Sequence, residues 1–335
     1  MRKIYESDPL PFTLKYDQYN KGVNEVVAYT QQLNERVELQ DMINYIASDD
    51  PSTKYQVSAN KNIAIFPSKK VRITVDSAKL IRNGIIPKNM TDKALGYVEW
   101  DIKSNYLYKN DLMLLDFLAT NQFDRPIYFA SPSSISDAVD VDKYCYQEGF
   151  VYRFLPVKQS EPDYVQGIGS VNADASYNIL MNKCKWGNLA DPRVYVDRES
   201  YRNSMIPKQN FVRLGKKLAS EGRYDSAVRV CDRVQEIFPD NKIHYDIYMS
   251  QFIEIYYMSN AMAKGNKLAN TLLDIYEENA DYISSLNPDF RGNYEEDLNQ
   301  AFGLFSLIRQ VADQYKQTAI VKRIDKYVNS RTGGK

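Results

Sequence analysis

The feature that most constrains the fold is a helical repeat pattern in the C-terminal part of the chain. Small and apolar residues recur there at the spacing of a tetratricopeptide repeat, in which two antiparallel helices pack closely and a proline ends the second. The positions that fit this pattern are Phe211, Leu214, Gly215, Leu218, Gly222, Tyr224, Ala227, Cys231 and Pro239. Because one such repeat cannot bury its apolar face alone, the pattern predicts that further helical pairs follow.

Helical periodicity does continue to the end of the chain. A second pair is indicated over residues 245–276, with a first helix longer than the repeat usually has, and a third pair over residues 294–328. We therefore assign residues 206–332 to an all-α, tetratricopeptide-like domain. A stack of helical pairs offers a concave groove to a peptide or protein partner, and the alternative is a stack that serves only as scaffold.

The N-terminal half mixes strand and helix signals. Residues 71–75 alternate apolar and polar side chains as a half-buried strand does. Residues 37–47 carry apolar side chains at the helical period, and Asp76 and Asn83 are suitable start and stop signals for a short helix. The mixture predicts an α/β or α+β fold for this half, in which residues 1 to about 35 wrap around the domain as extended chain.

Three regions follow from these patterns. Residues 1–165 are predicted to form the α/β domain, and residues 166–205 a linker that contains a short helix. Residues 206–332 form the helical repeat domain described above.

The segment 105–130 has the most specific sequence. A helix that starts at Asn110 or Asp111 would bury one apolar face, and Pro126 would then open a short buried strand. The residues on that buried face are Leu112, Leu115, Leu118 and Ala119.

Aromatic and polar side chains gather around this helix and strand. Tyrosine has a flat apolar face and a polar tip, which suit sugar stacking and protein interfaces. The simpler interpretation is local architecture, with Asp124 and Arg125 paired and the tyrosines packed at the helix ends; the alternative is a binding site for a partner protein or a glycan. The predicted cluster comprises Trp100, Asn105, Tyr106, Tyr108, Asp124, Arg125 and Tyr128.

Several classes of chemistry lack a motif in this sequence. His244 is the only histidine, which excludes His-rich metal sites and recognisable Ser-His or Cys-His catalytic motifs. Asp137, Asp140 and Asp142 resemble part of a calcium-binding loop, but the sixth position is not the required glycine. Phosphate-binding glycine loops are absent as well. We therefore expect no catalytic residue, metal or cofactor in this chain.

Charge, cysteine count and hydropathy argue against a nucleic-acid partner, a disulfide or metal framework and a membrane helix. The chain has 43 basic and 43 acidic residues, a balance that argues against nucleic acid as a partner. Cys145, Cys184 and Cys231 are odd in number and lack metal-site spacing, so free thiols are favoured over a Cys145–Cys184 disulfide. No run of apolar residues reaches the length of about 18–20 that a membrane helix needs.

Several segments together resemble a known family. Leu10–Leu14, Val75–Lys79, Asn105–Ala130 and Lys185–Asn188 precede the repeat segment in this order. In these segments the chain resembles the C-terminal soluble region of a bacterial membrane-protein family, which is similar to the transmembrane-protein-260-like protein O-mannosyltransferases.

The resemblance implies that the chain is part of a larger enzyme. Its membrane portion would transfer a sugar such as mannose from a lipid phosphosugar to a protein, and would hold the catalytic residues. The chain would then be a non-catalytic module on the periplasmic side of the inner membrane, tethered by membrane helices that this sequence lacks. Its partners would be its own membrane domain and an acceptor protein or glycan. Two alternatives remain open: a free-standing interaction scaffold of repeat type, and a soluble carbohydrate-active enzyme with an unmarked carboxylate pair.

Overall fold

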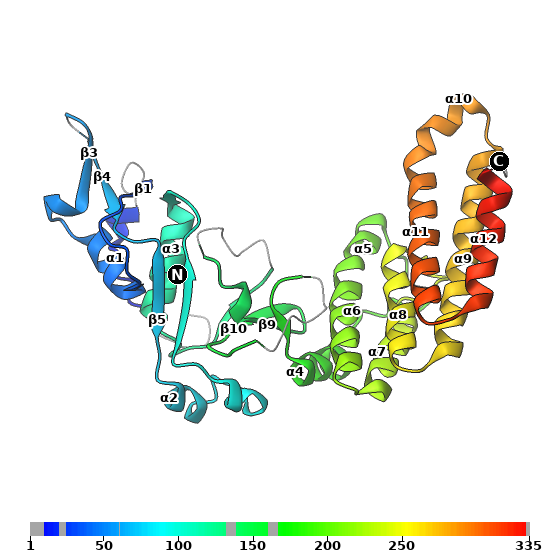
Figure 1. Ribbon diagram of the computed structural model, residues 1–335, viewed down its shortest axis with the longest axis horizontal. Helices are drawn as coiled ribbons and strands as arrows, with labels where there is room; N and C mark the ends of the chain where they lie inside the picture. Colours follow the sequence, from blue (N-terminus) through cyan, green and yellow to red (C-terminus); the bar gives the residue numbers. More distant parts are fainter. Residues whose placement is uncertain (1–9, 20–24, 60, 132–138, 160–166, 333–335) are drawn as a thin grey trace. The chain divides into compact units, whose positions relative to one another are not determined.

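The computed structural model describes residues 10–19, 25–59, 61–131, 139–159 and 167–332 (Figure 1). The chain divides into two compact units. The first unit comprises Met1–Asp163 with Gly167–Asn172, and the second comprises Tyr164–Gln166 with Ala173–Lys335.

The described residues of the first unit form three small sheets and three α-helices. One four-stranded sheet has the order β3-β4-β1-β7, with β1 parallel to β4 and antiparallel to β7. Its strands are β1 (Val26–Tyr29), β3 (Lys54–Ser58), β4 (Lys61–Phe66) and β7 (Tyr106–Tyr108). The helices are α1 (Leu39–Ala47), α2 (Ser77–Arg82) and α3 (Lys109–Asn121).

The other two sheets are also of mixed direction. The second has the order β11-β9-β10-β8, and the third has the order β2-β5-β6. Their strands are β2 (Val37–Glu38), β5 (Lys70–Thr74), β6 (Tyr97–Asp101), β8 (Ile127–Phe129), β9 (Cys145–Glu148), β10 (Val151–Phe154) and β11 (Ser170–Val171). The predicted combination of helices and strands is thus confirmed for this part of the chain, and its sheets are of mixed direction.

Helix α1 forms where the apolar period predicted it. Leu39, Met42, Ile43 and Ile46 are all buried, and α1 packs against α3. In α2 the Asp76 carboxylate accepts the N–H of Lys79, and Asn83 follows the last turn. Short-range helix signals were therefore sufficient at both places.

Strand β1 corrects the expectation that the first residues only wrap the domain. Val27 is completely buried, because β1 lies between β4 and β7 in the interior of its sheet. The strand is four residues long and pairs with partners far along the chain, so its own sequence carries little signal.

Helix α3 buries Leu112, Leu115, Leu118 and Ala119 as predicted, but it begins earlier than expected. Tyr108 occupies the N-cap position in place of Asn110 or Asp111. The Asp111 carboxylate accepts the backbone N–H of Tyr108 at 2.9 Å, and this hydrogen bond satisfies a donor that the first helical turn leaves free.

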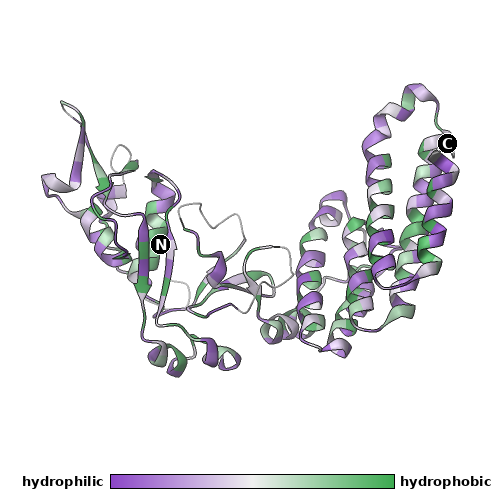
Figure 2. Cartoon of the chain, viewed as in Figure 1, coloured by the Kyte–Doolittle hydropathy of each residue, from purple (hydrophilic) through white to green (hydrophobic). Residues whose placement is uncertain are grey.

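The second unit is helical. Helices α6 and α7, α8 and α9, and α11 and α12 pack as successive pairs, and each later pair contacts the pair before it. Its helices are α4 (Ala173–Tyr177), α5 (Arg198–Asn203), α6 (Met205–Ser220), α7 (Tyr224–Ile237), α8 (Ser250–Met258), α9 (Met262–Ser285), α10 (Pro288–Arg291), α11 (Glu295–Gln314) and α12 (Thr318–Thr332). Apolar and polar residues alternate along these helices in Figure 2, as expected of helices that bury one face.

The second helical pair differs from its prediction. A long first helix and a short second helix were expected, whereas α8 has nine residues and α9 has 24. Asn260 adopts a left-handed conformation, with φ of 59°, between the two helices. This turn ends the first helix early, because a left-handed residue cannot continue it.

Much of the segment predicted as a linker packs within the second unit. Helix α4 contacts α6, and Arg223 donates to the Asp174 carboxylate at 2.8 Å. The centre of the Trp186 ring lies 5.6 Å from the centre of the Phe211 ring and 5.8 Å from that of the Phe238 ring. Residues 173–203 therefore include segments that pack against the helices of the second unit. Within the described residues, no helix combines the length and apolar character needed to cross a bilayer.

Substitution by alanine at two helical glycines is expected to change the free energy of unfolding in opposite directions. A Cβ on Gly265 would lie 2.4 Å from a ring carbon of Tyr257, which is buried and donates its hydroxyl to Asn266. We expect Gly265→Ala to lower the free energy of unfolding by about 1–2 kcal/mol, because the clash outweighs the helix propensity gained.

Gly303 is the matched control, since it lies in α11 with no atom within 4 Å of an added Cβ. We expect Gly303→Ala to raise the free energy of unfolding by about 0.5–1 kcal/mol. Urea denaturation followed by helical circular dichroism compares the two variants. Stabilisation by both substitutions would contradict the close contact between α8 and α9.

Candidate functional site

The residues of the predicted cluster are divided among three sheets and one turn. Trp100 lies on β6 and is 2% exposed, so its assignment to a binding surface is corrected: it is a core residue. Tyr106 and Tyr108 lie on β7, and Tyr128 lies on β8. Neighbours in sequence separate here because the chain changes sheet twice between β6 and β8.

The tyrosines of β7 lie on an exposed face of the first sheet. Tyr106 and Tyr108 are 51% and 54% exposed on this edge strand. The strand register places Tyr55 of β3, at the opposite edge, on the same face. Asn105, which precedes β7, accepts a hydrogen bond from Lys69 Nζ at 2.6 Å. This face presents exposed aromatic surface.

Asp124 and Arg125 follow α3 in an exposed turn. The Asp124 carboxylate pairs with Lys79 of α2 at 2.8 Å, and both side chains are more than half exposed. The carbonyl of Arg125 accepts the side-chain amide of Asn121 at 2.8 Å. These contacts join α2 and the turn to α3, which agrees with a role in local architecture.

Tyr128 belongs to a polar network that the sequence did not reveal. The Arg153 guanidinium lies 5.7 Å from the centre of the Tyr128 ring and 3.4 Å from Glu148 Oε1. Arg153 also donates to the carbonyl of Ile85 at 2.6 Å, and Asn172 donates to Glu148 at 2.8 Å. We call these four side chains, of Tyr128, Glu148, Arg153 and Asn172, the Arg153 network.

The Arg153 network joins adjacent strands of the second sheet. Arg153 on β10 faces Tyr128 on β8 across the antiparallel ladder, and Glu148 is 7% exposed on β9. Burial raises the pKa of the Tyr128 hydroxyl, although the Arg153 charge opposes this shift. The buried Glu148 carboxylate requires a cationic partner, which Arg153 supplies. The signal in the sequence is weak: one glutamate ends the short strand β9, and one arginine lies in the short strand β10.

A second buried carboxylate, that of Asp116, lies within the 105–130 segment. Asp116 in α3 is completely buried and accepts the backbone N–H groups of Thr13 and Leu14, each at 3.0 Å. It also accepts the hydroxyls of Tyr19 at 2.9 Å and Thr120 at 3.1 Å. Burial and the hydrogen bond to Asp116 raise the pKa of Tyr19. Asp116 thereby holds residues 13–19 against α3.

The second unit contains a cavity of about 870 Å³, which we call the tyrosine groove. Its walls come from α5, the segment after α7, the C-terminal half of α9 and the start of α11. The aromatic residues that line it are Tyr201, Tyr245, Tyr276, Tyr282 and Tyr294. The carboxylates that line it are Asp240, Asp246, Glu278 and Asp297.

The carboxylates of the tyrosine groove differ in their partners. Asp246 pairs with Lys208 at 2.8 Å, and the Lys208 side chain is fully buried beneath it. Asp240 accepts the N–H of Tyr245 at 2.8 Å. Glu278 and Asp297 are exposed and form no ion pair with any described residue. Two of the four groove carboxylates, those of Glu278 and Asp297, therefore have no ion-pair partner among the described residues.

Burial and the nearby carboxylates raise the pKa of two tyrosines in the groove. Burial and the nearby Asp240 raise the pKa of Tyr245 to about 12. Burial, with a smaller contribution from Asp246, likewise raises the pKa of Tyr276 to about 12. Both hydroxyls are thus neutral donors at physiological pH. His244, the only histidine of the sequence, lines the groove with its side chain 81% exposed.

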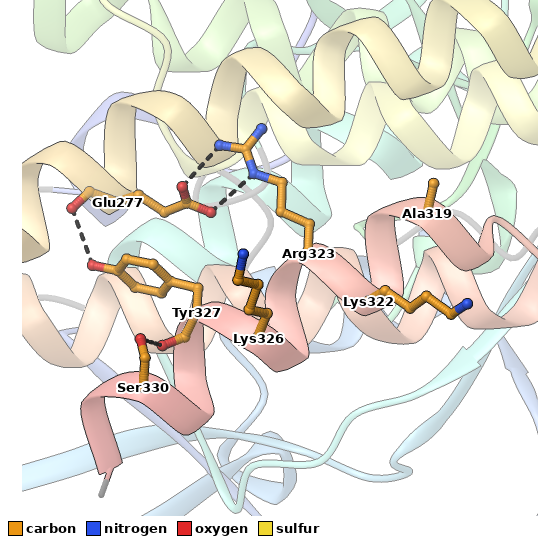
Figure 3. Close-up of a pocket in the computed structure, with 7 residues that line it drawn as sticks. All are labelled: Glu277, Ala319, Lys322, Arg323, Lys326, Tyr327 and Ser330. Carbon is orange, nitrogen blue, oxygen red and sulfur yellow. Dashed lines mark hydrogen bonds and ion pairs between the residues drawn. The ribbon is translucent and has the colours of Figure 1, made fainter.

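A second cavity, of about 560 Å³, lies between α9 and α12 (Figure 3). Arg323 points across it to Glu277, with nitrogen–oxygen distances of 3.1 and 2.8 Å, and Tyr327 donates to the Glu277 carbonyl at 3.1 Å. Arg323 also donates to Asp274 at 2.6 Å. These bonds fasten the last helix to α9, so we interpret this cavity as structural.

The cysteines and the acidic loop residues form no metal or disulfide site among the described residues. All three cysteines are free; Cys145 and Cys231 are buried, as expected of free thiols in a core. Asp140 pairs with Lys103 at 2.9 Å, whereas Asp137 lies outside the described residues. Among the residues with a described position, no group of three His, Cys, Asp or Glu side chains is arranged to hold a metal ion.

Comparison with known proteins identifies the family. The model of a family described as TMEM260-associated domain 2 matches residues 1–175, more than half of the chain's 335 residues. The chain therefore belongs to this family, in agreement with the resemblance found in its sequence. No curated protein and no solved structure matches the chain.

Proposed function

We propose that this chain is a non-catalytic, extracytoplasmic module of a membrane-embedded glycosyltransferase that resembles the protein O-mannosyltransferases. Its role is to recruit the acceptor protein or another partner of that enzyme. Membership of the TMEM260-associated domain 2 family is the observation that carries this proposal. The tyrosine groove supports it, because the groove offers a binding surface within the second unit.

The helical pairs of the second unit are proposed to form a tetratricopeptide-like array. The close approach of helices at small residues supports this: a Cβ on Gly215 in α6 would lie 2.9 Å from Ile255 in α8. Ala227 and Cys231 of α7 are completely buried, as packing positions of such a repeat would be. An array of this kind is suited to binding extended partners.

Catalysis is assigned to the membrane part of the complete protein, on the periplasmic side of the inner membrane. The buried carboxylates of the first unit support this division, since Asp116 and Glu148 are engaged in structural hydrogen bonds. A carbohydrate-active enzyme is the alternative that Glu278 and Asp297 favour, because both lie unpaired in a tyrosine-lined groove. Hydrolysis of aryl glycosides by the isolated chain would support that alternative.

Complementation of a deletion strain tests the proposal. The complete gene is restored with or without residues 1–335, and hexose on periplasmic proteins is measured by intact mass spectrometry. We expect hexose to be lost when this region is absent, while the membrane part remains inserted. Unchanged hexose in every strain would overturn the proposal and favour a free-standing interaction scaffold.

A further inference from the structure

We propose that the tyrosine groove binds an extended, cationic segment of the partner protein, with arginine or lysine side chains seated between tyrosine rings and carboxylates. This inference rests on the proposed recruiting function and specifies the chemistry of the partner. Three properties of the groove carry it: its charge, the arrangement of its walls and its size.

The charge of the groove requires a cation. Four carboxylates line it, and Lys208 neutralises Asp246 from beneath. No lysine or arginine is among the lining residues, so Glu278 and Asp297 face the opening without a cation, while the imidazole of His244 lies 4.0 Å from the Asp240 carboxylate. A neutral sugar would leave these charges unpaired, whereas a basic peptide would neutralise them.

Two walls of the groove repeat the same pair of side chains. On α9, Glu278 and Tyr282 are four residues apart and therefore lie on one face of the helix. At the start of α11, the N-cap residue Tyr294 and Asp297 of the first turn both line the groove. Tyr282 is 62% exposed and Tyr294 is 41% exposed, so both rings are available.

Each of these pairs is suited to one basic side chain. A guanidinium or ammonium group can pair with the carboxylate while it lies over the adjacent aromatic ring, where the ring's negative face attracts it. Because there is one pair on each wall, the groove would engage two basic residues of one segment. Its volume of about 870 Å³ is within the range of ligand sites, about 300–1,000 Å³.

Fluorescence polarisation with the complete chain tests the inference. The probe is a fluorescein-labelled peptide in which arginines alternate with serines, and its counterpart has glutamate at each arginine. We expect the basic peptide to bind and the acidic peptide not to bind. Glu278→Gln with Asp297→Asn should weaken binding about 10-fold, since each exposed ion pair contributes a factor of about 2–5.

Matched variants separate this site from general charge. Asp225→Asn with Asp313→Asn removes the same charge from exposed positions of α7 and α11 that do not line the groove, and should leave the affinity unchanged. Tyr282→Phe should keep the affinity, whereas Tyr282→Ser should weaken it about 2–5-fold. All of these side chains are exposed, and thermal denaturation checks that each variant is folded.

Three outcomes would overturn the inference. The first is absence of peptide binding at low ionic strength, and the second is equal weakening by the groove and control variants. The third is displacement of the labelled peptide by mannotriose but not by unlabelled basic peptide, which would make the groove a glycan site. None of these outcomes affects the complementation result, so failure of this inference is distinguishable from failure of the proposed function.

Discussion

Replacement of Asp116 by alanine is expected to lower the free energy of unfolding of the first unit by about 3–5 kcal/mol. The completely buried carboxylate accepts two backbone N–H groups and two hydroxyls. Its loss leaves those donors without an acceptor, each at a cost of about 1–3 kcal/mol unless water reaches it. Residues 13–19 would then detach from α3, which limits the total.

Tryptophan fluorescence measures this loss. Trp100 reports on the core of the first unit, and a Trp186→Phe background removes the second tryptophan of the chain. Asp116→Asn keeps the shape of the side chain and should cost less than alanine. Asp92→Ala, at an exposed position, should change the stability by less than about 0.5 kcal/mol. A cost below about 1 kcal/mol for Asp116→Ala would contradict the buried network.

Replacement of Arg153 by alanine is expected to destabilise the same unit by about 3 kcal/mol. It leaves Glu148 buried without its cation and removes the hydrogen bond to the Ile85 carbonyl. The double variant Arg153→Ala with Glu148→Gln should lose less stability than the sum of the losses in the two single variants. The reason is that Glu148→Gln removes the buried charge that needed Arg153 as a partner.

Arg82→Ala is the matched control for Arg153, since Arg82 is an exposed arginine in α2 of the same unit. It should have an effect of less than about 0.5 kcal/mol. The same Trp100 signal in urea reports both variants. Additive effects of Arg153→Ala and Glu148→Gln would show that the two side chains do not interact.

Sequence predicted best those elements whose signals are local. The apolar period of α1, the cap at Asp76 and the buried face of α3 were all legible from neighbouring residues. Helix-to-helix turns were less so: Asn260 ends α8 early through a backbone conformation that the apolar pattern does not reveal.

Features that depend on distant pairing were missed. Strand β1 is recognisable only through its partners β4 and β7, and the Arg153 network forms only when β8, β9 and β10 come together. The same reason explains why the predicted cluster around Trp100 and Tyr128 is dispersed: closeness in sequence does not survive a change of sheet. The tyrosine groove could not be predicted from the sequence, because its lining comes from four separate segments.

Hexose on acceptor proteins, measured by intact mass spectrometry, tests the central claim most directly. The deletion strain receives the complete gene with Glu278→Gln and Asp297→Asn, or with the control pair Asp225→Asn and Asp313→Asn. We predict that the groove variant lowers hexose occupancy while its membrane part stays inserted, and that the control pair restores it fully. Full occupancy with the groove variant would contradict a role of the groove in presenting the acceptor.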